Sequence, residues 1–373
     1  MELAFTPEQQ ELVRTVRAFT KKELAPHTAR WDRTDEIPLV AWRRMGELGL
    51  LGLRTPARYG GQEGDLLTVG LATEEIARGD FSATHVIQVA NLAGEIIGKN
   101  GSDEVKERWL PPAASGEALI ALALTEPTVG ADAANLACRA VLEGDEYVIT
   151  GEKSGITLGM IAQAAILFAR TGGAPRSRGV SAFLVPLDLP GVSRSGLRDM
   201  GSHALRRAVL SFDHVRIPAS HRLGAEGSGF YTIMRGFDYN RVIIALACLG
   251  AAGISLEETM AYVKERKAFG RALERVRAHV AEPAPRYARE IERHQKRGHP
   301  AGPLRPARAG EEDRGVRGHA EGDPRFLAGD HVLVALSHRA ARKVGGVGAD
   351  CRLGQRERDQ RLAGGGGREP ALL

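Results

Sequence analysis

The stretch ALTEPTVGAD, residues 123–132, decides how this sequence is interpreted, together with GEKSGIT at residues 151–157. Proline and glycine fix the path of the first stretch as a turn. Peptide N–H groups and small hydroxyls in such a turn point at a ligand rather than into a β-ladder. The sequence therefore predicts a ligand-binding loop, followed one β-hairpin later by a second turn at Ile156-Thr157. An ordinary surface turn is the alternative interpretation of the loop taken alone.

Alternating apolar residues surround these two turns. Two short apolar runs, 141–142 and 147–149, flank Glu143-Gly144-Asp145-Glu146, which is a hairpin pattern. Further strands are expected at 165–170, 180–187 and 209–217, separated by Gly, Pro and Ser clusters. Residues 119–225 are therefore predicted to form a middle β-domain resembling a barrel.

Helical patterns dominate residues 1–118. Thr6-Pro7-Glu8-Gln9 combines an N-cap, a proline at the first helical position and a capping-box glutamine. Apolar spacing predicts further helices at 38–48, 66–78 and 82–99, and Pro111-Pro112 is expected to close this all-helical domain. The stripe Val86, Val89, Leu92 and Ala93 most often means core, with a pocket lining as the alternative.

Helix resumes near Gly229, with an apolar face from Val242 to Gly250, so residues 226–275 are predicted to begin a C-terminal helical domain. Residues 276–373 are of a different kind. The 100 residues from Glu274 hold 18 Arg, 15 Gly, 7 Pro and six of the 11 His. Such a composition buries too little apolar surface to offset its ordering entropy, and it predicts a largely disordered tail. We hypothesise a frameshift close to Arg275.

Bulk composition excludes several classes of protein. The hydrophobic fraction of 43% and charged fraction of 26% are typical of a soluble globular protein, and no apolar run was expected to span a membrane. No signal peptide is expected, and three distant cysteines favour a reduced cytoplasm without a metal site. Residues 274–373 carry 20 Lys+Arg against 14 Asp+Glu, so the basic balance belongs to the tail. A nucleic-acid-binding protein is therefore the weakest interpretation.

Two further motifs allow a family to be named. FDYNR at 237–241, followed by CLGAA at 248–252, and RKAFG at 266–270 stand after the two turns. All four motifs resemble those of the acyl-CoA dehydrogenase family, in family order across residues 1–273. Within the family, GEKSGIT, VSAFLVP at 180–186 and FDYNR are similar to a branch that acts on cyclohexane- or cyclohexene-carboxyl-CoA.

The resemblance implies an α+β fold with an N-terminal helical domain, a middle β-domain and the start of a C-terminal four-helix bundle. It implies FAD as cofactor, an acyl-CoA thioester oxidised at its α,β-carbons, an electron-transfer flavoprotein as electron acceptor, and a homotetramer. The implied flavin contacts are Leu122, Leu124, Thr125, Gly130, Gly155, Ile156, Thr157, Arg266 and Phe269. The implied substrate contacts are Ala131, Asp238, Arg241 and Asn91.

Two positions depart from the family pattern, because Gly155 replaces a tryptophan and Ala131 replaces a serine. Two others have simpler alternatives. Asp238 and Arg241 can form an ordinary ion pair within a helix, and Arg266 can be a solvated charge.

The catalytic base of the family is a carboxylate that removes the α-proton. It stands in the last helices in most members, and no matching motif follows Arg275. The two other family positions hold Asn240 and Asn91, which cannot take up a proton. The catalytic residue is therefore unassigned. Two interpretations remain, an active FAD-dependent acyl-CoA dehydrogenase and a catalytically incompetent, frameshifted remnant of one.

Overall fold

The computed structural model describes residues 5–268 and 270–273. These residues fall into two compact units, one that reaches Ile254 and one that begins at Ser255. The expectations for Phe269 and for the tail from residue 274 lie outside the described residues.

Six α-helices precede the sheet, and four of them (α1, α3, α4 and α5) were predicted from the helical patterns, whereas α2 and α6 were not. They are α1 (Pro7–Phe19), α2 (Thr28–Thr34), α3 (Leu39–Glu47), α4 (Leu66–Ala77), α5 (Phe81–Asn100) and α6 (Asp103–Ser115). The capping box of α1 is confirmed, since the Thr6 hydroxyl accepts from the Gln9 amide and the Gln9 side chain accepts from the Thr6 amide. Asp65, Asp80 and Ser102 cap α4, α5 and α6 in the same way.

The expectation that Pro111-Pro112 ends the helical region is wrong. Both prolines lie inside α6, which continues to Ser115 and ends at Gly116 in the left-handed conformation (φ 78°). A proline deprives a helix of one backbone hydrogen bond, a cost of about 3 kcal/mol in a helix interior. The buried neighbours Leu110 and Ala113 pack into the core, and this burial keeps the last turn helical.

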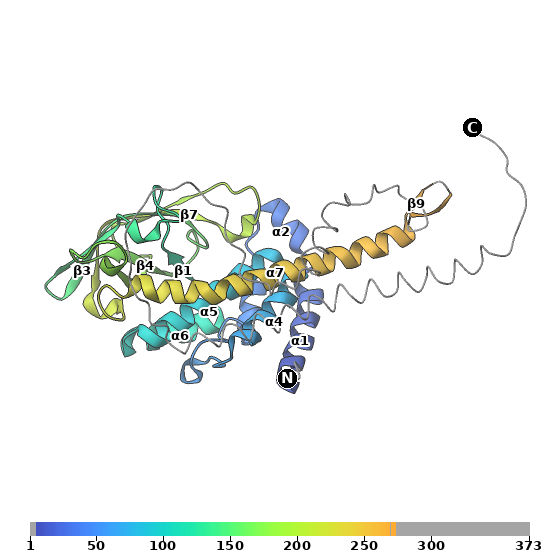
Figure 1. Cartoon of the computed structure of the whole chain (residues 1–373), viewed down its shortest axis with the longest axis horizontal. Coiled ribbons are helices and arrows are strands. Elements are labelled where there is room, and N and C mark those ends of the chain that lie inside the picture. The colour runs from blue at the N-terminus through green and yellow to red at the C-terminus, as the bar shows by residue number, and fades with distance from the viewer. Residues whose placement is uncertain (1–4, 269, 274–373) are drawn as a thin grey trace, which may run out of the picture. The chain divides into compact units, whose positions relative to one another are not determined.

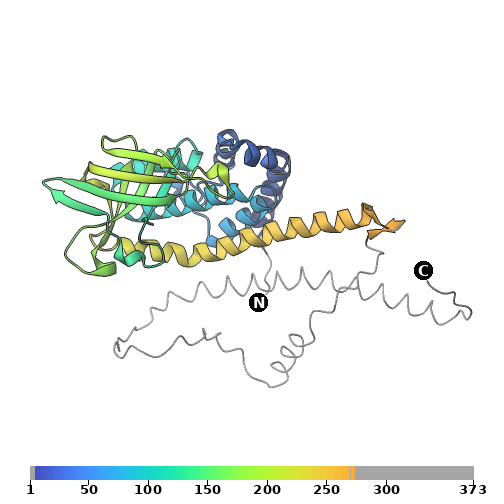
Figure 2. The same ribbon diagram turned by 90° about the horizontal axis from the view of Figure 1, so that it is seen from above.

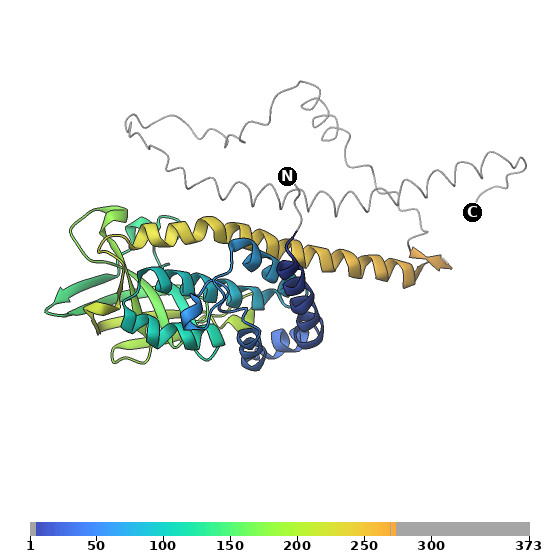
Figure 3. The same cartoon turned by 90° about the horizontal axis from the view of Figure 1, so that it is seen from below.

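Eight strands form one sheet in the order β6-β7-β3-β2-β4-β5-β8, with β1 pairing in parallel to β4 (Figure 2). Their bounds are β1 (Ile120–Ala123), β2 (Arg139–Glu143), β3 (Glu146–Ile156), β4 (Ala164–Arg170), β5 (Val180–Pro186), β6 (Val192–Gly196), β7 (Ala208–Pro218) and β8 (Arg222–Leu223). The predicted hairpin is confirmed as β2–β3, with Gly144 at φ 66° in its turn. Strands β4 and β5 are almost wholly buried, and α5 lies next to β1 (Figure 3).

Helix α7 (Gly229–Glu265) returns along α4 and α5 within the first unit (Figure 1). Two glycines allow this close approach. A Cβ added to Gly250 would stand 2.2 Å from the Glu74 carbonyl oxygen of α4, and one added to Gly236 would stand 2.5 Å from Leu92 of α5. The face that touches these helices buries Ile243, Leu246 and Ala247.

The apolar character of α7 exceeds the sequence-based expectation. One 18-residue window reaches a mean hydropathy of 1.6, so by length and composition alone the helix could cross a membrane. Its first part packs on α4 and α5, and 22% of the apolar window is buried. Its other side exposes Ile244 and Leu249, as expected for a helix whose partners in a bundle are missing from the described part of the chain.

The second unit contains, in its described part, the end of α7 and a small antiparallel ribbon. The ribbon consists of β9 (Lys267–Ala268) and β10 (Arg271–Ala272), and Arg266 lies immediately before it.

Candidate functional site

The loop after β1 is a closed turn with several exposed residues. It closes through two hydrogen bonds between Glu126 and Val129, from amide to carbonyl in each direction (3.0 and 3.2 Å). Thr125, Gly130 and Ala131 are exposed, and a Cβ added to Gly130 would meet no atom within 4 Å. The loop therefore offers an open face of backbone and small side chains.

A buried ion pair under this loop holds it to β3. The ammonium of Lys153 lies 2.8 Å from Oε1 of Glu126 and also donates to the Leu124 carbonyl at 3.0 Å. Side-chain exposure is 0% for Lys153 and 3% for Glu126, so both charges are out of solvent. Losing one partner of such a pair leaves the other charge buried and uncompensated.

The carboxylate of Glu126 also accepts hydrogen bonds from the backbone after the loop. The backbone amides of Ala137 and Cys138 donate to it at 2.6 and 2.9 Å. Burial by itself raises the pKa of Glu126, but these amides and the Lys153 ammonium outweigh burial and hold the pKa below its usual value. Glu126 therefore ties three segments of backbone together as an anion.

The end of β3 lies against the same loop. The Ser154 amide donates to the Thr125 carbonyl at 2.9 Å, directly beside the Lys153 contact. Gly155 follows at φ 68°, exposed and with open space where a Cβ would stand. Ile156 is buried and paired with Ala208 of β7, and Thr157 is half-buried. The structure thus brings the two predicted turns together.

Leu122 belongs to β1, and its half-buried side chain packs against a hydrophobic cluster that includes Ile120 and Ile166. Its strand positions the loop, because β1 is paired to β4 along its whole length.

Sequence reasoning missed the Glu126–Lys153 pair. The two residues are 27 positions apart and lie on different elements, so no local spacing connects them. The available signal was chemical, since Lys153 is a charged residue at a buried position of β3.

The predicted substrate residues lie in two different settings. Asp238 and Arg241 form the exposed intrahelical ion pair (2.6 Å) that is the simpler alternative for them. Asn91 is buried, and its amide donates to the carbonyls of Leu50 and Ile87 and accepts from the amide of Arg54. Both amide hydrogens of Asn91 are therefore used inside the protein.

One carboxylate does lie between α5 and α7. Glu95 accepts from the Tyr239 hydroxyl at 2.7 Å and pairs with Arg54 at 3.1 Å and with Lys99. Burial raises the pKa of Glu95, but these donors outweigh burial and lower it overall. The Glu95 carboxylate therefore favours the ionised form, and its bond to Tyr239 links α5 and α7. No general base is assigned within the described part of the chain.

No group of three or more His, Cys, Asp or Glu side chains arranged to hold a metal ion occurs among residues 5–268 and 270–273. The arrangement that remains is an open, backbone-lined face formed by the β1 loop and the end of β3. A Cβ added at Gly130 or Gly155 would meet no atom within 4 Å, so this face is open at both glycines.

Comparison with known proteins identifies the fold and the family. Three family models match in order along the chain, described as acyl-CoA dehydrogenase N-terminal domain (residues 6–117), middle domain (121–215) and C-terminal domain (227–295). The third match continues past the boundary at residue 275 that the motifs suggested.

Two similar curated proteins are the probable acyl-CoA dehydrogenase YngJ of Bacillus subtilis and a short-chain specific acyl-CoA dehydrogenase of Clostridium acetobutylicum. The first is 38% identical over 277 residues, covering 73% of each chain. The second is 36% identical over 278 residues, covering 74% of this chain and 73% of the relative.

Solved structures agree with these relatives. A glutaryl-coenzyme A dehydrogenase in complex with glutaryl-CoA superimposes with a TM-score of 0.72 at 32% identity, covering 74% of this chain and 71% of that one. Butyryl-CoA dehydrogenase from Megasphaera elsdenii gives 0.70 at 29% identity, covering 79% and 77%. The chain belongs to the acyl-CoA dehydrogenase family.

Proposed function

We propose that this chain is a FAD-dependent acyl-CoA dehydrogenase that oxidises an acyl-CoA thioester at its α,β-carbons. The observation that carries the proposal is the joining of the β1 loop to the end of β3 by the Lys153–Glu126 pair and the Ser154–Thr125 hydrogen bond. FAD bound there would accept the two electrons removed from the substrate.

The residues that would hold the flavin come from both turns. Leu124 and Thr125 would present a backbone N–H and a hydroxyl to the ring system, and donors at that edge stabilise negative charge. Gly130, Gly155, Ile156 and Thr157 would line the rest of the face, which the two glycines leave open. Leu122 would support the loop from β1. Arg266 and Phe269 are proposed contacts from the C-terminal region, where Arg266 lies in the second unit and Phe269 lies outside the described residues.

The substrate would lie beside the exposed side of α7. Arg241 and Asp238 are proposed to bind the CoA portion, and Ala131 to lie near the substrate or cofactor. For Asn91, both amide hydrogens bond to the carbonyls of Leu50 and Ile87, so we propose that it positions α5 beside the substrate.

A substitution on α7 tests the CoA contact. Arg241→Gln is expected to raise the KM for acyl-CoA by about 10- to 100-fold with little change in kcat, because a hydrogen bond to a charged group is worth about 1.5–3 kcal/mol. Arg235→Gln is the matched control, since Arg235 is an exposed arginine on the same helix. Equal KM values in the two variants would contradict the contact.

We propose an alicyclic acyl group, cyclohexane- or cyclohexene-carboxyl-CoA, on the motifs GEKSGIT, VSAFLVP and FDYNR. The alternative substrate class is short-chain acyl-CoA, because relatives in Clostridium acetobutylicum and Homo sapiens are named short-chain specific. Flavin bleaching by cyclohexanecarboxyl-CoA at a higher kcat/KM than by butyryl-CoA is the expected result. The reverse order would assign the chain to short linear substrates.

An electron-transfer flavoprotein is the proposed electron acceptor. One similar structure, 31% identical with a TM-score of 0.70, is described as an electron transferring flavoprotein of Acidaminococcus fermentans. We further propose a homo-oligomer, a tetramer as in the family, because α7 exposes Ile244 and Leu249. A cytoplasmic location and the absence of nucleic-acid partners stay predictions.

The second candidate function is a catalytically incompetent remnant left by a frameshift. Two observations favour it, the amides Asn91 and Asn240 at two positions expected for the base and the end of the family match at residue 295. Resequencing the locus tests the frameshift, and an acyl-CoA-dependent bleaching of bound flavin would exclude the remnant.

A further inference from the structure

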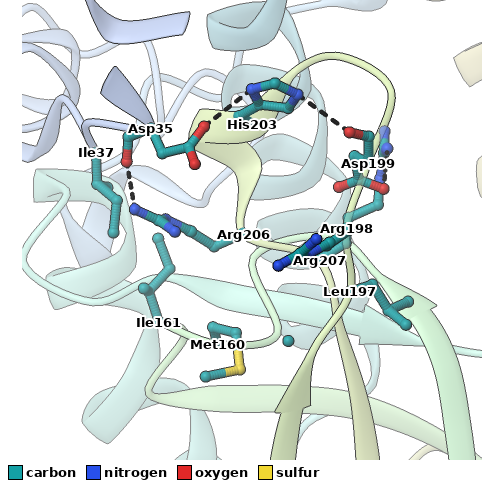
Figure 4. Close-up of a pocket in the computed structure, with 11 residues that line it drawn as sticks. Asp35, Ile37, Met160, Ile161, Leu197, Arg198, Asp199, His203, Arg206 and Arg207 are labelled. Carbon is teal, nitrogen blue, oxygen red and sulfur yellow. Dashed lines mark hydrogen bonds and ion pairs between the residues drawn. The ribbon is translucent and has the colours of Figure 1, made fainter. Parts of the chain in front are cut away.

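A cleft elsewhere in the protein is lined by none of the residues proposed to contact the flavin or the substrate. It has a volume of about 710 Å³ and is lined by the segment after α2, the turn between β3 and β4, and the connection from β6 to β7. Figure 4 shows charged side chains across its upper part and the apolar side chains of Ile161, Met160 and Leu197 below them. The cleft is therefore amphipathic, with one polar and one apolar wall.

The polar wall carries an excess of positive charge. Its lining includes three arginines, Arg198, Arg206 and Arg207, against two aspartates, Asp35 and Asp199. Arg207 is neutralised by an ion pair, with its Nη1 at 3.2 Å from Asp199, and no ion pair of Arg198 or Arg206 occurs among the described residues. Within the described residues the guanidinium of Arg198 has neither a hydrogen bond nor an ion pair.

His203 forms an ion pair with Asp35, the second aspartate of the cleft. Its Nδ1 lies 2.9 Å from the Asp35 carboxylate and 3.2 Å from the Asp32 carbonyl, and its Nε2 lies 3.1 Å from the Asp199 carbonyl. Acceptors on both sides of the ring favour the form with two N–H donors. The pKa of His203 is accordingly raised, first by the Asp32 carbonyl and then, after a smaller opposing effect of burial, by Asp35.

Arg206 contributes an unused donor. Its Nη2 donates to the backbone carbonyl of Asp35, but its Nε–H is shielded from solvent and has no acceptor in the part of the chain that the structure describes. A buried donor without a partner costs about 1–3 kcal/mol, so the described residues satisfy the guanidinium of Arg206 only in part.

The backbone around Arg206 is strained as well. Arg206 and Asp35 both adopt left-handed conformations, with φ of 44° and 53°. Such strain in residues other than glycine tends to persist at ligand-binding sites. The Met160 amide bonds to the Arg206 carbonyl at 3.2 Å, and this contact fixes the arginine against the apolar wall.

We propose that this cleft binds an organic phosphate, a phosphomonoester whose oxygens accept from Arg198 and Arg206 and whose apolar body rests on Met160 and Ile161. A dianionic phosphate matches the two positive charges left on the wall when His203 is protonated. Arginine guanidinium groups suit phosphate because they offer several donors in a planar fork. The site is independent of the proposed flavin face, since it uses none of residues 122–131 or 155–157.

Titration calorimetry on the purified full chain tests the site with three probes. Phenyl phosphate carries both the phosphate and an apolar body, inorganic phosphate lacks the body, and benzoate lacks the second charge. We expect saturable binding of phenyl phosphate, with inorganic phosphate and benzoate each at least about tenfold weaker. Absence of saturable phenyl phosphate binding would overturn the proposal, and so would equal affinity for all three probes.

Arg198→Gln is the decisive variant because Arg198 is exposed and its side chain makes no hydrogen bond or ion pair among the described residues. It is expected to weaken phenyl phosphate binding by about 10- to 100-fold without changing the unfolding midpoint. Arg14→Gln, which removes an exposed arginine from α1, is the matched control and is expected to leave binding unchanged. An unchanged affinity in Arg198→Gln would overturn the assignment.

Discussion

Lys153 and Glu126 are the residues on which the proposed flavin site depends most. Lys153→Met would leave the Glu126 carboxylate buried without its cation, and we expect a loss of about 3–5 kcal/mol in the free energy of unfolding. Urea unfolding measures this loss, and FAD titration of the folded variant should show weakened binding because the loop is released. The double variant with Glu126→Gln should recover part of the stability, since no buried charge then remains.

The matched control is Arg14→Met, which removes one member of an exposed pair on α1. Exposed pairs contribute about 0–1 kcal/mol, so this variant should unfold close to the parent. If Lys153→Met were as stable as Arg14→Met, the buried pair would not hold the loop.

Acid stability follows from the same carboxylates. The pKa values of Glu126 and Glu95 are lowered in the folded protein below the ordinary value for a glutamate side chain. Their contribution is therefore fully present above about pH 4.5 and is lost as the pH falls through the lowered folded values. A melting temperature that declines below about pH 4.5, and declines less steeply in Glu126→Gln, is the expected result. Equal slopes in both proteins would contradict this account.

At the residue scale, the two turns were predictable from the sequence, but the Lys153–Glu126 pair that joins them was not. Thr125 and Gly155 are recognisable because proline, glycine and small polar residues have local conformational preferences. The Lys153–Glu126 pair and the saturated amide of Asn91 depend on segments that meet only after folding. Residue spacing alone therefore could not reveal them.

At the scale of elements, burial decided the outcome wherever local propensity was misleading. The hairpin β2–β3 and strands β4, β5 and β7 follow from alternation and turn residues. Helix α6 was missed because two prolines argued against it, whereas packing around Leu110 maintains it. The apolar character of α7 is greater than the sequence indicated, because its apolar residues lie along one continuous helix of 37 residues.

The contact between α7 and α4 gives a test at this scale. Gly250→Ala places a Cβ 2.2 Å from the Glu74 carbonyl oxygen, so the helices must move apart. We expect a loss of about 1–3 kcal/mol in the free energy of unfolding, measured by urea denaturation.

Gly253→Ala is the matched control on the same helix. Its Cβ would meet only the end of the Arg78 side chain, at 3.1 Å. Alanine favours helix over glycine by up to about 1 kcal/mol, so this variant should equal or exceed the parent in stability. Equal losses in both variants would show that the close approach of α7 to α4 does not determine stability.

At the scale of the whole molecule, the region that matches the family differs in composition from the tail. The family match covers three domains up to residue 295, and the basic excess lies in residues 274–373. The proposed flavin site draws on Arg266 and Phe269 as well as on the β1 loop. Whether this chain retains the cofactor is therefore the point at which the enzyme and the remnant differ.

The most direct measurement is the flavin content of the purified full-length chain, by absorbance spectrum and by titration with added FAD. The account predicts a yellow protein that binds close to one FAD per chain and loses affinity in Lys153→Met. A correctly folded but colourless protein that takes up no added FAD would contradict it.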